Sequence, residues 1–261
     1  MKENSQFNVY AAFYDLLYKD KDYRGEAHYI DQLITKFLDK NKSTTSLLDL
    51  ACGTGKHLIE LSGKGFAALT GSDISKSMIE VAEKNAEANG KHIKFYNYSF
   101  QESDKINATF DVVISMFSAI NYLTSYADQS KTLSNVHKLL DSGGLFIFDY
   151  WNGCAVTESY SPVKILRKKQ ENAEIIRISE TNLDQVAQSA TVKFTCNYFS
   201  DNVRLAEFEE IHHLHYYYFS EMKNLLQSHR FEILQISPFM HMDKVVTPQE
   251  WNISIIARKI G

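Results

Sequence analysis

Hydrophobic residues along the chain recur with different periods, and each period predicts a different kind of element. In the first 40 residues they recur at helical spacing, which predicts two helices separated by the polar segment 19–22. From residue 46 to residue 148, short apolar runs alternate with amphipathic stretches. This alternation is typical of a parallel sheet covered by helices on both faces. The runs predict strands at 46–50, 66–70, 93–96, 110–115 and 145–148, and the stretches predict helices at 56–62, 75–88 and 129–140.

The pattern changes after residue 150. Residues 160–215 alternate apolar and polar side chains without a helical period, which predicts a small antiparallel sheet. A helix that ends at His229, with Ser220 as its N-cap, then resumes the first pattern. Two final strands are expected at 231–236 and 252–257.

These elements predict an α/β fold with a seven-stranded, mostly parallel sheet, helices on both faces and an inserted small antiparallel β-sheet. We expect residues 1–152 to hold the N-terminal helices and the main part of the sheet. Residues 153–218 would form the inserted subdomain, acting as a substrate lid or an oligomer contact. Residues 219–261 would supply the last helix and the two strands that complete the core.

Composition narrows the class of protein. The formal net charge is −4, which argues against a nucleic-acid partner because such proteins usually present a basic face. The N-terminal residues lack the apolar segment of a signal peptide, and no apolar run has the length of a membrane span. The 3 cysteines have no CxxC spacing, so neither a zinc site nor a disulfide framework is expected. We expect a cytoplasmic enzyme without a membrane contact.

The candidate binding segment is Leu47-Leu48-Asp49-Leu50-Ala51-Cys52-Gly53-Thr54-Gly55-Lys56-His57. It predicts a strand, a glycine-containing turn and a helix. Glycine lets the backbone turn sharply and lets a ligand approach closely, and the helix N-terminus presents free N–H groups. Such a turn could hold a dinucleotide, a phosphate group or S-adenosylmethionine (SAM).

The spacing within this segment separates the three ligands. No GxxxxGK[ST] is present, which argues against a P-loop. Leu58 stands where the third glycine of a dinucleotide fingerprint would be. Asp49 lies on the strand before the turn, where a carboxylate would repel a pyrophosphate but attract the sulfonium and ammonium groups of SAM. The spacing therefore favours SAM.

A second carboxylate follows about 20 residues later. Asp73, in Gly71-Ser72-Asp73-Ile74-Ser75, ends the second predicted strand. A carboxylate at this position can accept hydrogen bonds from both hydroxyls of an adenosine ribose. Ile74 beside it, and Met78 one helical turn later, could cover the adenine. Taken alone, Asp73 is equally well read as a helix N-cap.

Together these motifs resemble a known series. The stretches LLDLACGTGKH, GSDISKSM and FDVVISMFSAINYL are similar to the motifs of class I SAM-dependent methyltransferases, which have a Rossmann-like fold. The resemblance covers residues 47–151. YAAFYDLLYKDKDY, at residues 10–23, and the insertion resemble the small-molecule branch. That branch includes N-methyltransferases of nucleotide-linked amino sugars and glycine N-methyltransferases.

The resemblance implies roles for individual residues, most of them on the cofactor, while Tyr14 and Tyr23 would close over the cofactor or the substrate. It implies that the backbone of Ala51 and Gly53 contacts the methionine part of SAM, with Asp73 on the ribose. This family usually has aspartate where Ser99 stands, so the contact to the adenine amino group departs from the family pattern. The implied cofactor-binding residues are Tyr14, Tyr23, Asp49, Ala51, Gly53, Gly55, Asp73, Ile74, Met78, Ser99, Phe100 and Met116.

Methyl transfer from a sulfonium requires alignment of the nucleophile and exclusion of water, and it needs neither a metal nor a covalent intermediate. An amine acceptor must first lose a proton. Tyr14 and Tyr122 are the candidate catalytic residues, although some sugar N-methyltransferases have histidine at the place of Tyr122. The candidate substrate-pocket residues are Phe117, Tyr150, His213 and His215.

Three functions remain open from the sequence. The first is a methyltransferase that acts on a small molecule, foremost the nitrogen of an amino sugar or another amine. The second is a nucleic-acid methyltransferase, against which the missing [DN]PP[YFW] motif and the acidic charge argue. The third is a non-catalytic SAM-binding regulatory protein. The oligomeric state is also open, and the insertion could pair edge to edge in a homodimer.

Overall fold

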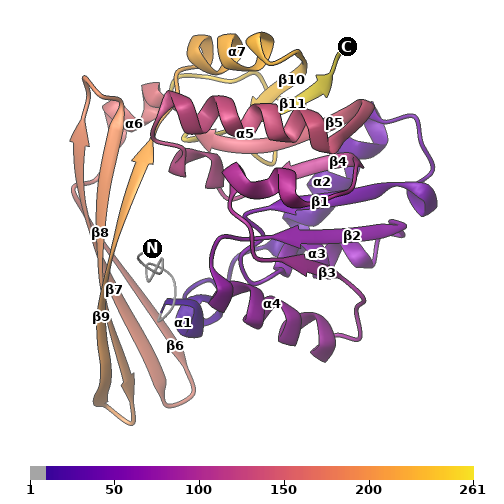
Figure 1. Ribbon diagram of the computed structural model, residues 1–261. Coiled ribbons are helices and arrows are strands. Elements are labelled where there is room, and N and C mark those ends of the chain that lie inside the picture. The colour runs from indigo at the N-terminus through magenta and orange to yellow at the C-terminus, as the bar shows by residue number, and fades with distance from the viewer. Residues whose placement is uncertain (1–9) are drawn as a thin grey trace.

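In the computed structural model, which describes residues 10–261, the chain forms two separate sheets (Figure 1). The larger sheet has 7 strands in the order β10-β11-β5-β4-β1-β2-β3. The strands β1 to β5 pair in parallel, and β11 runs antiparallel to both of its neighbours, β5 and β10. The strands are β1 (Ser46–Leu50), β2 (Ala68–Ser72), β3 (Lys94–Tyr96), β4 (Phe110–Ser115), β5 (Leu140–Trp151), β10 (Phe231–Pro238) and β11 (Asn252–Lys259).

Helices cover both faces of this sheet, as expected, because its central strands are apolar on both sides. One face packs against α5 and α7, with Leu48 of β1 among the buried residues. The other packs against α2, α3 and α4, with Leu47 among them. The helices are α1 (Tyr10–Leu17), α2 (Tyr23–Phe37), α3 (Lys56–Ser62), α4 (Lys76–Ala88), α5 (Tyr126–Leu139), α6 (Gly153–Ser159) and α7 (Phe219–Ser228), with 3-10 helices η2 (Lys42–Thr44), η3 (Phe100–Lys105) and η4 (Ala119–Tyr122).

The second sheet is antiparallel and stands beside the carboxyl ends of the parallel strands, with α1 between it and α4 (Figure 1). One face carries buried side chains, among them Ile175, Val192 and Cys196, and it faces the main sheet. The prediction of an α/β fold with an inserted antiparallel sheet is confirmed. The strands are β6 (Val163–Gln170), β7 (Ala173–Asp184), β8 (Ser189–Ser200) and β9 (Val203–His215).

Several predicted element boundaries were wrong. The second strand begins at Ala68 and not at 66, because the N–H of Ala67 bonds to the carbonyls of Lys42 and Thr45 instead of a ladder partner. Strand β5 is longer than predicted, because it includes residues 141–144, which were expected to form a turn. Gly143 takes a φ of 75° there, at an irregularity in the pairing with β4. The N-cap of α7 is Tyr218 and not Ser220, which lies inside the helix.

Helix α6, a short segment between the two sheets, was not predicted. The predicted division at 152/153 and 218/219 stays a prediction, although all four strands of the second sheet lie between Val163 and His215. Within residues 10–261, no helix combines the length and the apolar character that a membrane crossing requires.

Candidate active site

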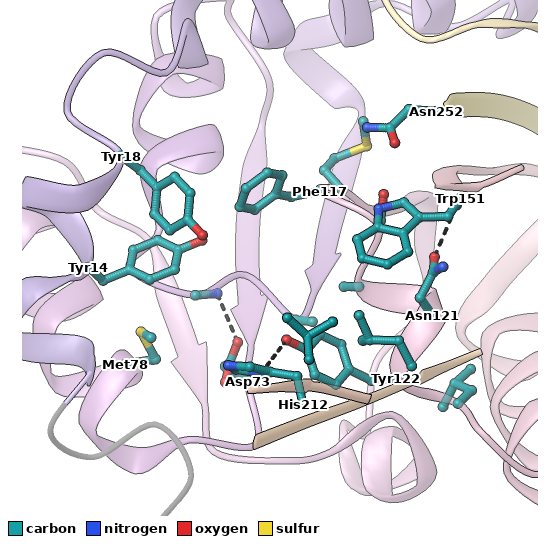
Figure 2. A pocket seen from close by; sticks show the side chains of 18 of the residues that line it. Tyr14, Tyr18, Asp73, Met78, Phe117, Asn121, Tyr122, Trp151, His212 and Asn252 are labelled. Atoms are coloured by element: carbon teal, nitrogen blue, oxygen red, sulfur yellow. Dashed lines mark hydrogen bonds between the residues drawn. The ribbon is translucent and has the colours of Figure 1, made fainter. Parts of the chain in front are cut away.

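A cavity of about 520 Å³ lies where the two sheets face each other (Figure 2). Its walls come from the carboxyl ends of the parallel strands, from the N-terminal helices and from the buried face of the second sheet. Ligands of open parallel sheets bind at this edge. Among the predicted site residues, those that line the cavity are Tyr14, Tyr23, Ala51, Gly53, Asp73, Ile74, Met78, Ser99, Phe100, Met116, Phe117 and Tyr122.

The glycine turn after β1 gives the cavity a backbone wall. Ala51, Gly53 and Gly55 all have positive φ angles, of 63°, 54° and 76°. A Cβ atom placed on Gly53 would meet nothing within 4 Å, so the turn leaves open space beside it. Gly55 lies behind the turn, where a Cβ would press on Phe95, and it does not line the cavity. Gly53 thus allows close approach of a ligand, while Gly55 serves the turn itself.

Asp73 joins the glycine turn to the second strand. One carboxylate oxygen accepts from the N–H of Gly53 at 2.9 Å, and the other accepts from the N–H of Ser75 at 2.9 Å (Figure 2). Burial raises the pKa of Asp73, and the two backbone hydrogen bonds oppose that rise. The N-cap of α4 is Ser75 and not Asp73. Asp73 is therefore held rigidly at the cavity wall, where a ribose could meet it.

Asp49 lies behind this wall and not on it. Its side chain is 1% exposed, and its Oδ2 has no hydrogen-bond partner within the described part of the chain. Burial and the nearby charge of Asp73 raise its pKa well above the ordinary value. A buried carboxylate with an unpaired oxygen is stabilised by a cation nearby, and the sulfonium and ammonium groups of SAM are cations. The residues present thus fit this cofactor.

The far end of the cofactor wall is apolar and suits an adenine ring. Ile74, Met78 and Phe100 line it, and Ile74 is 45% exposed. The Ser99 hydroxyl, which stands where the family usually has aspartate, donates to Glu102 at 3.1 Å. Glu102 does not line the cavity, so Ser99 does not replace the carboxylate of the family at this end.

A tight turn after β4 brings Met116 and Phe117 into the cavity. Phe117 and Ser118 have φ angles of 64° and 56°, which non-glycine residues seldom adopt. Both oxygens of Asp149 accept from the N–H of Ser118 at 3.0 Å, and one also accepts from its hydroxyl at 2.9 Å. Burial raises the pKa of Asp149 to about 6, against these hydrogen bonds. Asp149 thus clamps the turn from behind.

The N-terminal segment closes the cavity from another side. Asp15 of α1 accepts from the Thr54 hydroxyl at 2.8 Å and lies 3.0 Å from the Lys56 ammonium, so α1 is tied to the glycine turn. Tyr14 and Tyr23 line the cavity, as the resemblance implied they would lie near the cofactor. Burial raises the pKa of Tyr23, which keeps its phenol protonated.

The second sheet contributes three further polar side chains, none of them among the predicted site residues. Arg177 of β7 donates to the Tyr18 hydroxyl at 2.7 Å and lies 4.3 Å from the ring centre of Phe194. His212 of β9 is 2.9 Å from the Tyr122 hydroxyl (Figure 2). Lys164 of β6 lies over the ring of Trp251 at 5.1 Å. Arg177, His212 and Lys164 all line the cavity.

Three predicted substrate-pocket residues lie outside the cavity. His213 is exposed on the opposite side of β9 from His212, because side chains alternate along a strand. His215 is buried and lies 2.9 Å from Glu221 of α7. Tyr150 is fully buried in the core of the main sheet, on the side of α5 and α7. The prediction placed the wrong set of alternating residues of β9 in the cavity. Leu214 and Val192 are apolar and lie on the same face as His212, and this pattern could have indicated that His212 points inward.

Comparisons with known proteins support the same cofactor chemistry. Residues 47–144 match the profile of a methyltransferase domain. A putative methyltransferase of Geobacillus sp. (strain WCH70) is 23% identical over 88% of this chain and 91% of its own. The dTDP-3-amino-3,4,6-trideoxy-alpha-D-glucopyranose N,N-dimethyltransferase of Streptomyces venezuelae is 26% identical over 71% of this chain and 75% of its own.

Solved structures share the fold over nearly the whole chain. A crystal structure of a SAM-dependent methyltransferase from Clostridium acetobutylicum ATCC 824 superposes with a TM-score of 0.81 at 20% identity, covering 98% of this chain and 99% of the other. That of Streptomyces venezuelae DesVI gives 0.77 at 20% identity, covering 94% and 97%. Residues 47–144 therefore carry a methyltransferase domain, and the solved structures confirm the predicted fold over nearly the whole chain.

Proposed function

We propose that this chain transfers the methyl group of SAM to the nitrogen of a small amine, with an amino sugar as the leading candidate. The observation that carries the proposal is the continuous cavity of about 520 Å³, which runs from the glycine turn to the buried face of the second sheet. This sheet stands over the carboxyl edge of the parallel strands (Figure 1). A chamber of this size suits a small acceptor.

The cofactor would be held by residues of the main sheet. Gly53 and Ala51 offer backbone, Asp73 offers a fixed carboxylate for the ribose, and Ile74 and Phe100 offer an apolar surface for the adenine. When bound, SAM supplies an electrophilic methyl group whose leaving group is a neutral sulfide. The protein's own task is to orient the acceptor nitrogen and to exclude water. Tyr14 and Tyr122 remain the candidates for contact with that nitrogen.

The acceptor would occupy the part of the cavity beneath the second sheet. Trp151 and Trp251 form an aromatic pair there with ring centres 5.6 Å apart. Lys164 and Arg177 add two positive charges, which suits an acceptor with an anionic group. Named relatives support an amine: those of Streptomyces venezuelae and Streptomyces fradiae are dTDP-amino-sugar N,N-dimethyltransferases, and one of Parasynechococcus marenigrum is a glycine/sarcosine N-methyltransferase.

The two alternatives have less support. A nucleic-acid substrate would meet a cavity roofed by the second sheet and a net charge of −4. A regulatory protein that binds SAM without turnover would not need the polar groups that line the acceptor part. The cytoplasmic location and a homodimer through the second sheet stay predictions.

Calorimetry and a product assay test the proposal together. We expect SAM and S-adenosylhomocysteine to bind with one site per chain. We then expect a panel of small amines, including amino sugars with and without a nucleotide, to release S-adenosylhomocysteine and to gain 14 mass units per methyl group. Hydroxyl analogues of the same compounds, tRNA and duplex DNA serve as controls. Methylation of RNA or of the hydroxyl analogues in preference to the amines would contradict the proposal.

A further inference from the structure

Two carboxamide side chains meet at Trp151, in the acceptor part of the cavity. The backbone N–H of Trp151 donates to Oδ1 of Asn121, in the 3-10 helix η4, at 3.3 Å. Asn252 begins β11 directly opposite Trp151 in the antiparallel ladder, so these two side chains lie on the same face of the sheet. Asn121, Trp151 and Asn252 all line the cavity, and Figure 2 shows the three side chains together. They form one corner of the cavity.

The bond to Trp151 fixes the orientation of the Asn121 carboxamide. A backbone N–H can only donate, so the atom that faces it is the oxygen, and Nδ2 lies on the other side of the group. Asn121 is 0% exposed, and its Nδ2 has no hydrogen-bond partner within residues 10–261. A buried amide without a partner costs free energy, because it has given up its hydrogen bonds to water. A ligand oxygen beside Nδ2 would remove this cost.

Asn252 presents the complementary group to the same corner. Its Oδ1 is buried and likewise has no hydrogen-bond partner in the part of the chain that the structure describes. An amide oxygen accepts a hydrogen bond from a hydroxyl group. Both carboxamides are neutral at every pH at which the protein is folded. The corner thus offers one unpaired donor and one unpaired acceptor, which together match neutral oxygen groups of a ligand.

The surface beside these two groups is aromatic. The rings of Trp151 and Trp251 have centres 5.6 Å apart and planes inclined at 65°, and both residues line the cavity. An indole presents a flat apolar face that can pack against the face of a ligand ring. An apolar face with a few polar groups at its edge is typical of pockets that orient a small ligand. The corner is therefore suited to a compact ring that carries oxygen atoms on its rim.

We propose that Asn121 and Asn252 are specificity-determining residues, which select a methyl acceptor whose ring carries oxygen atoms. Asn121 donates from Nδ2 to an ether or hydroxyl oxygen of the ring, Asn252 accepts from a hydroxyl group, and the ring packs on the Trp151 indole. This inference rests on the proposed function and narrows the acceptor from amines in general to cyclic, oxygenated amines. A site with buried polar groups rejects an analogue that lacks the matching groups, because its own groups then stay unpaired.

Three probe amines of one ring size test these contacts on the wild-type protein. Cyclohexylamine has no oxygen, 4-aminotetrahydropyran has an ether oxygen in the ring, and 4-aminotetrahydropyran-3-ol adds a hydroxyl. The isomers with exchanged amine and hydroxyl positions are tested alongside. The chain has 2 tryptophans, Trp151 and Trp251, so its tryptophan fluorescence reports binding at this corner without turnover. Each probe is titrated into the complex with S-adenosylhomocysteine.

We expect the Kd to fall about tenfold from cyclohexylamine to the aminotetrahydropyran, the equivalent of one hydrogen bond. The hydroxyl should lower the Kd about tenfold again. We call the first ratio the ether preference and the second the hydroxyl preference. Equal affinity for the three probes would overturn the proposal, and so would a fluorescence signal that responds to none of them.

Two leucine variants assign each preference to one residue. Leucine has nearly the shape of asparagine but carries neither a donor nor an acceptor. Asn121→Leu should abolish the ether preference, and Asn252→Leu should abolish the hydroxyl preference while keeping the ether preference. If a variant weakens all three probes by the same factor, the residue only supports the wall of the cavity, and its assignment fails.

The matched control removes a different buried amide that holds η4. Gln129 of α5 donates to the carbonyl of Leu123 at 3.0 Å, is buried and does not line the cavity. Gln129→Leu should keep both preferences at their wild-type values, whatever its effect on stability. Loss of the ether preference in this variant would show that the position of η4 sets the selectivity, and not the donor of Asn121.

Failure of this inference is distinguishable from failure of the proposed function. If the wild type binds no S-adenosylhomocysteine, the proposed function fails, and the probes can still be titrated into the free protein. If the probes bind in the expected order but no amine is methylated, the corner is confirmed and the proposed function fails. If amines with and without ring oxygens are methylated with equal kcat/KM, only the role of Asn121 and Asn252 fails.

Discussion

The two sides of the cavity are built in different ways. We call the cavity residues from 47 to 118 the cofactor side and those from 119 to 252 the acceptor side. On the cofactor side, Asp73 bonds to Gly53, 20 residues away, and the partners are mostly backbone N–H groups. On the acceptor side, Tyr122 meets His212, 90 residues away, and both partners are side chains. The contacts of the cofactor side join residues that are close in the sequence and involve backbone groups. The contacts of the acceptor side join side chains that are far apart in the sequence.

This difference shows where each property of the enzyme is specified. Backbone contacts depend on the turn and change little when neighbouring side chains change. Side-chain contacts between two sheets depend on the identity and the parity of every residue involved. The cofactor side can therefore stay constant while the acceptor side is altered to suit another amine. We expect substitutions on the two sides to affect different kinetic constants.

The largest expected effect tests the cofactor side. Asp73→Ala removes the carboxylate that orders the glycine turn and that would accept the ribose hydroxyls. Hydrogen bonds to a charged group contribute about 1.5–3 kcal/mol each, so we expect at least a 100-fold weaker affinity for SAM, measured by calorimetry.

The control for Asp73 is Asp111→Asn, a change at another buried carboxylate on the main sheet. Asp111 lies at the start of β4, at the opposite edge, where its carboxylate accepts from the Ser46 N–H at 2.9 Å. That variant should keep the wild-type affinity for SAM. If both variants fold and bind SAM with equally reduced affinity, the effect of Asp73→Ala would not be specific to the carboxyl edge of the sheet.

The next effect concerns Asp149, which lies where the two sides meet and clamps the turn at Ser118. Its pKa is raised from 3.8 to about 6, so the folded state binds the proton more tightly than the unfolded state. Stability contributed by this group is full below pH 4 and is lost as the pH rises through 6. The difference corresponds to about 3 kcal/mol at most.

Asp149→Asn should remove that loss, because an amide can still accept from the Ser118 N–H and donate to its hydroxyl. Relative to wild type, the free energy of unfolding of the variant should rise by up to about 3 kcal/mol between pH 4 and pH 8, measured by urea denaturation. Asp111→Asn should show a change of the opposite sign, and mostly below pH 4, because the pKa of Asp111 is lowered and its stabilising effect is lost only as the pH falls. Burial opposes ionisation of Asp111, but hydrogen bonds from Lys40 and Ser46 outweigh it and lower its pKa. If the difference in unfolding free energy between Asp149→Asn and wild type does not change with pH, ionisation of the buried Asp149 carboxyl does not destabilise the folded state.

The same contrast explains how much could be predicted from the sequence. The glycine turn, Asp73 and the strands β1 and β4 were predicted because their signals lie within a few residues of each other. Strand β4 was predicted to the residue, since its six positions are all buried and apolar runs of this kind have few alternatives. Boundaries went wrong where a tertiary contact decides them, as at Ala67.

The acceptor side could not be predicted in the same way. His213 was predicted to line the cavity and His212 was not. The sequence shows that residues of β9 alternate between two faces, but it does not show which of the two faces is buried. The buried face is set by the packing of β9 against the main sheet. Arg177 lies on a half-buried strand, and nothing near it in the sequence marks it as a cavity residue; its partner Tyr18 is 159 residues away.

The smallest expected effect tests whether the acceptor side acts apart from the cofactor side. Arg177→Met keeps most of the side-chain length but removes the positive charge that lies against Tyr18 and Phe194. If an anionic group of the acceptor binds there, the KM for the acceptor should rise about tenfold, while the affinity for SAM changes less than twofold. Arg167→Met is the matched control, because Arg167 lies on the neighbouring strand but pairs with Glu174 and does not line the cavity. A neutral acceptor that suffers the same rise in KM would show that Arg177 supports the walls of the cavity instead of binding charge. A large loss of SAM affinity in Arg177→Met would show that the two sides are coupled, and the division between them would have to be given up.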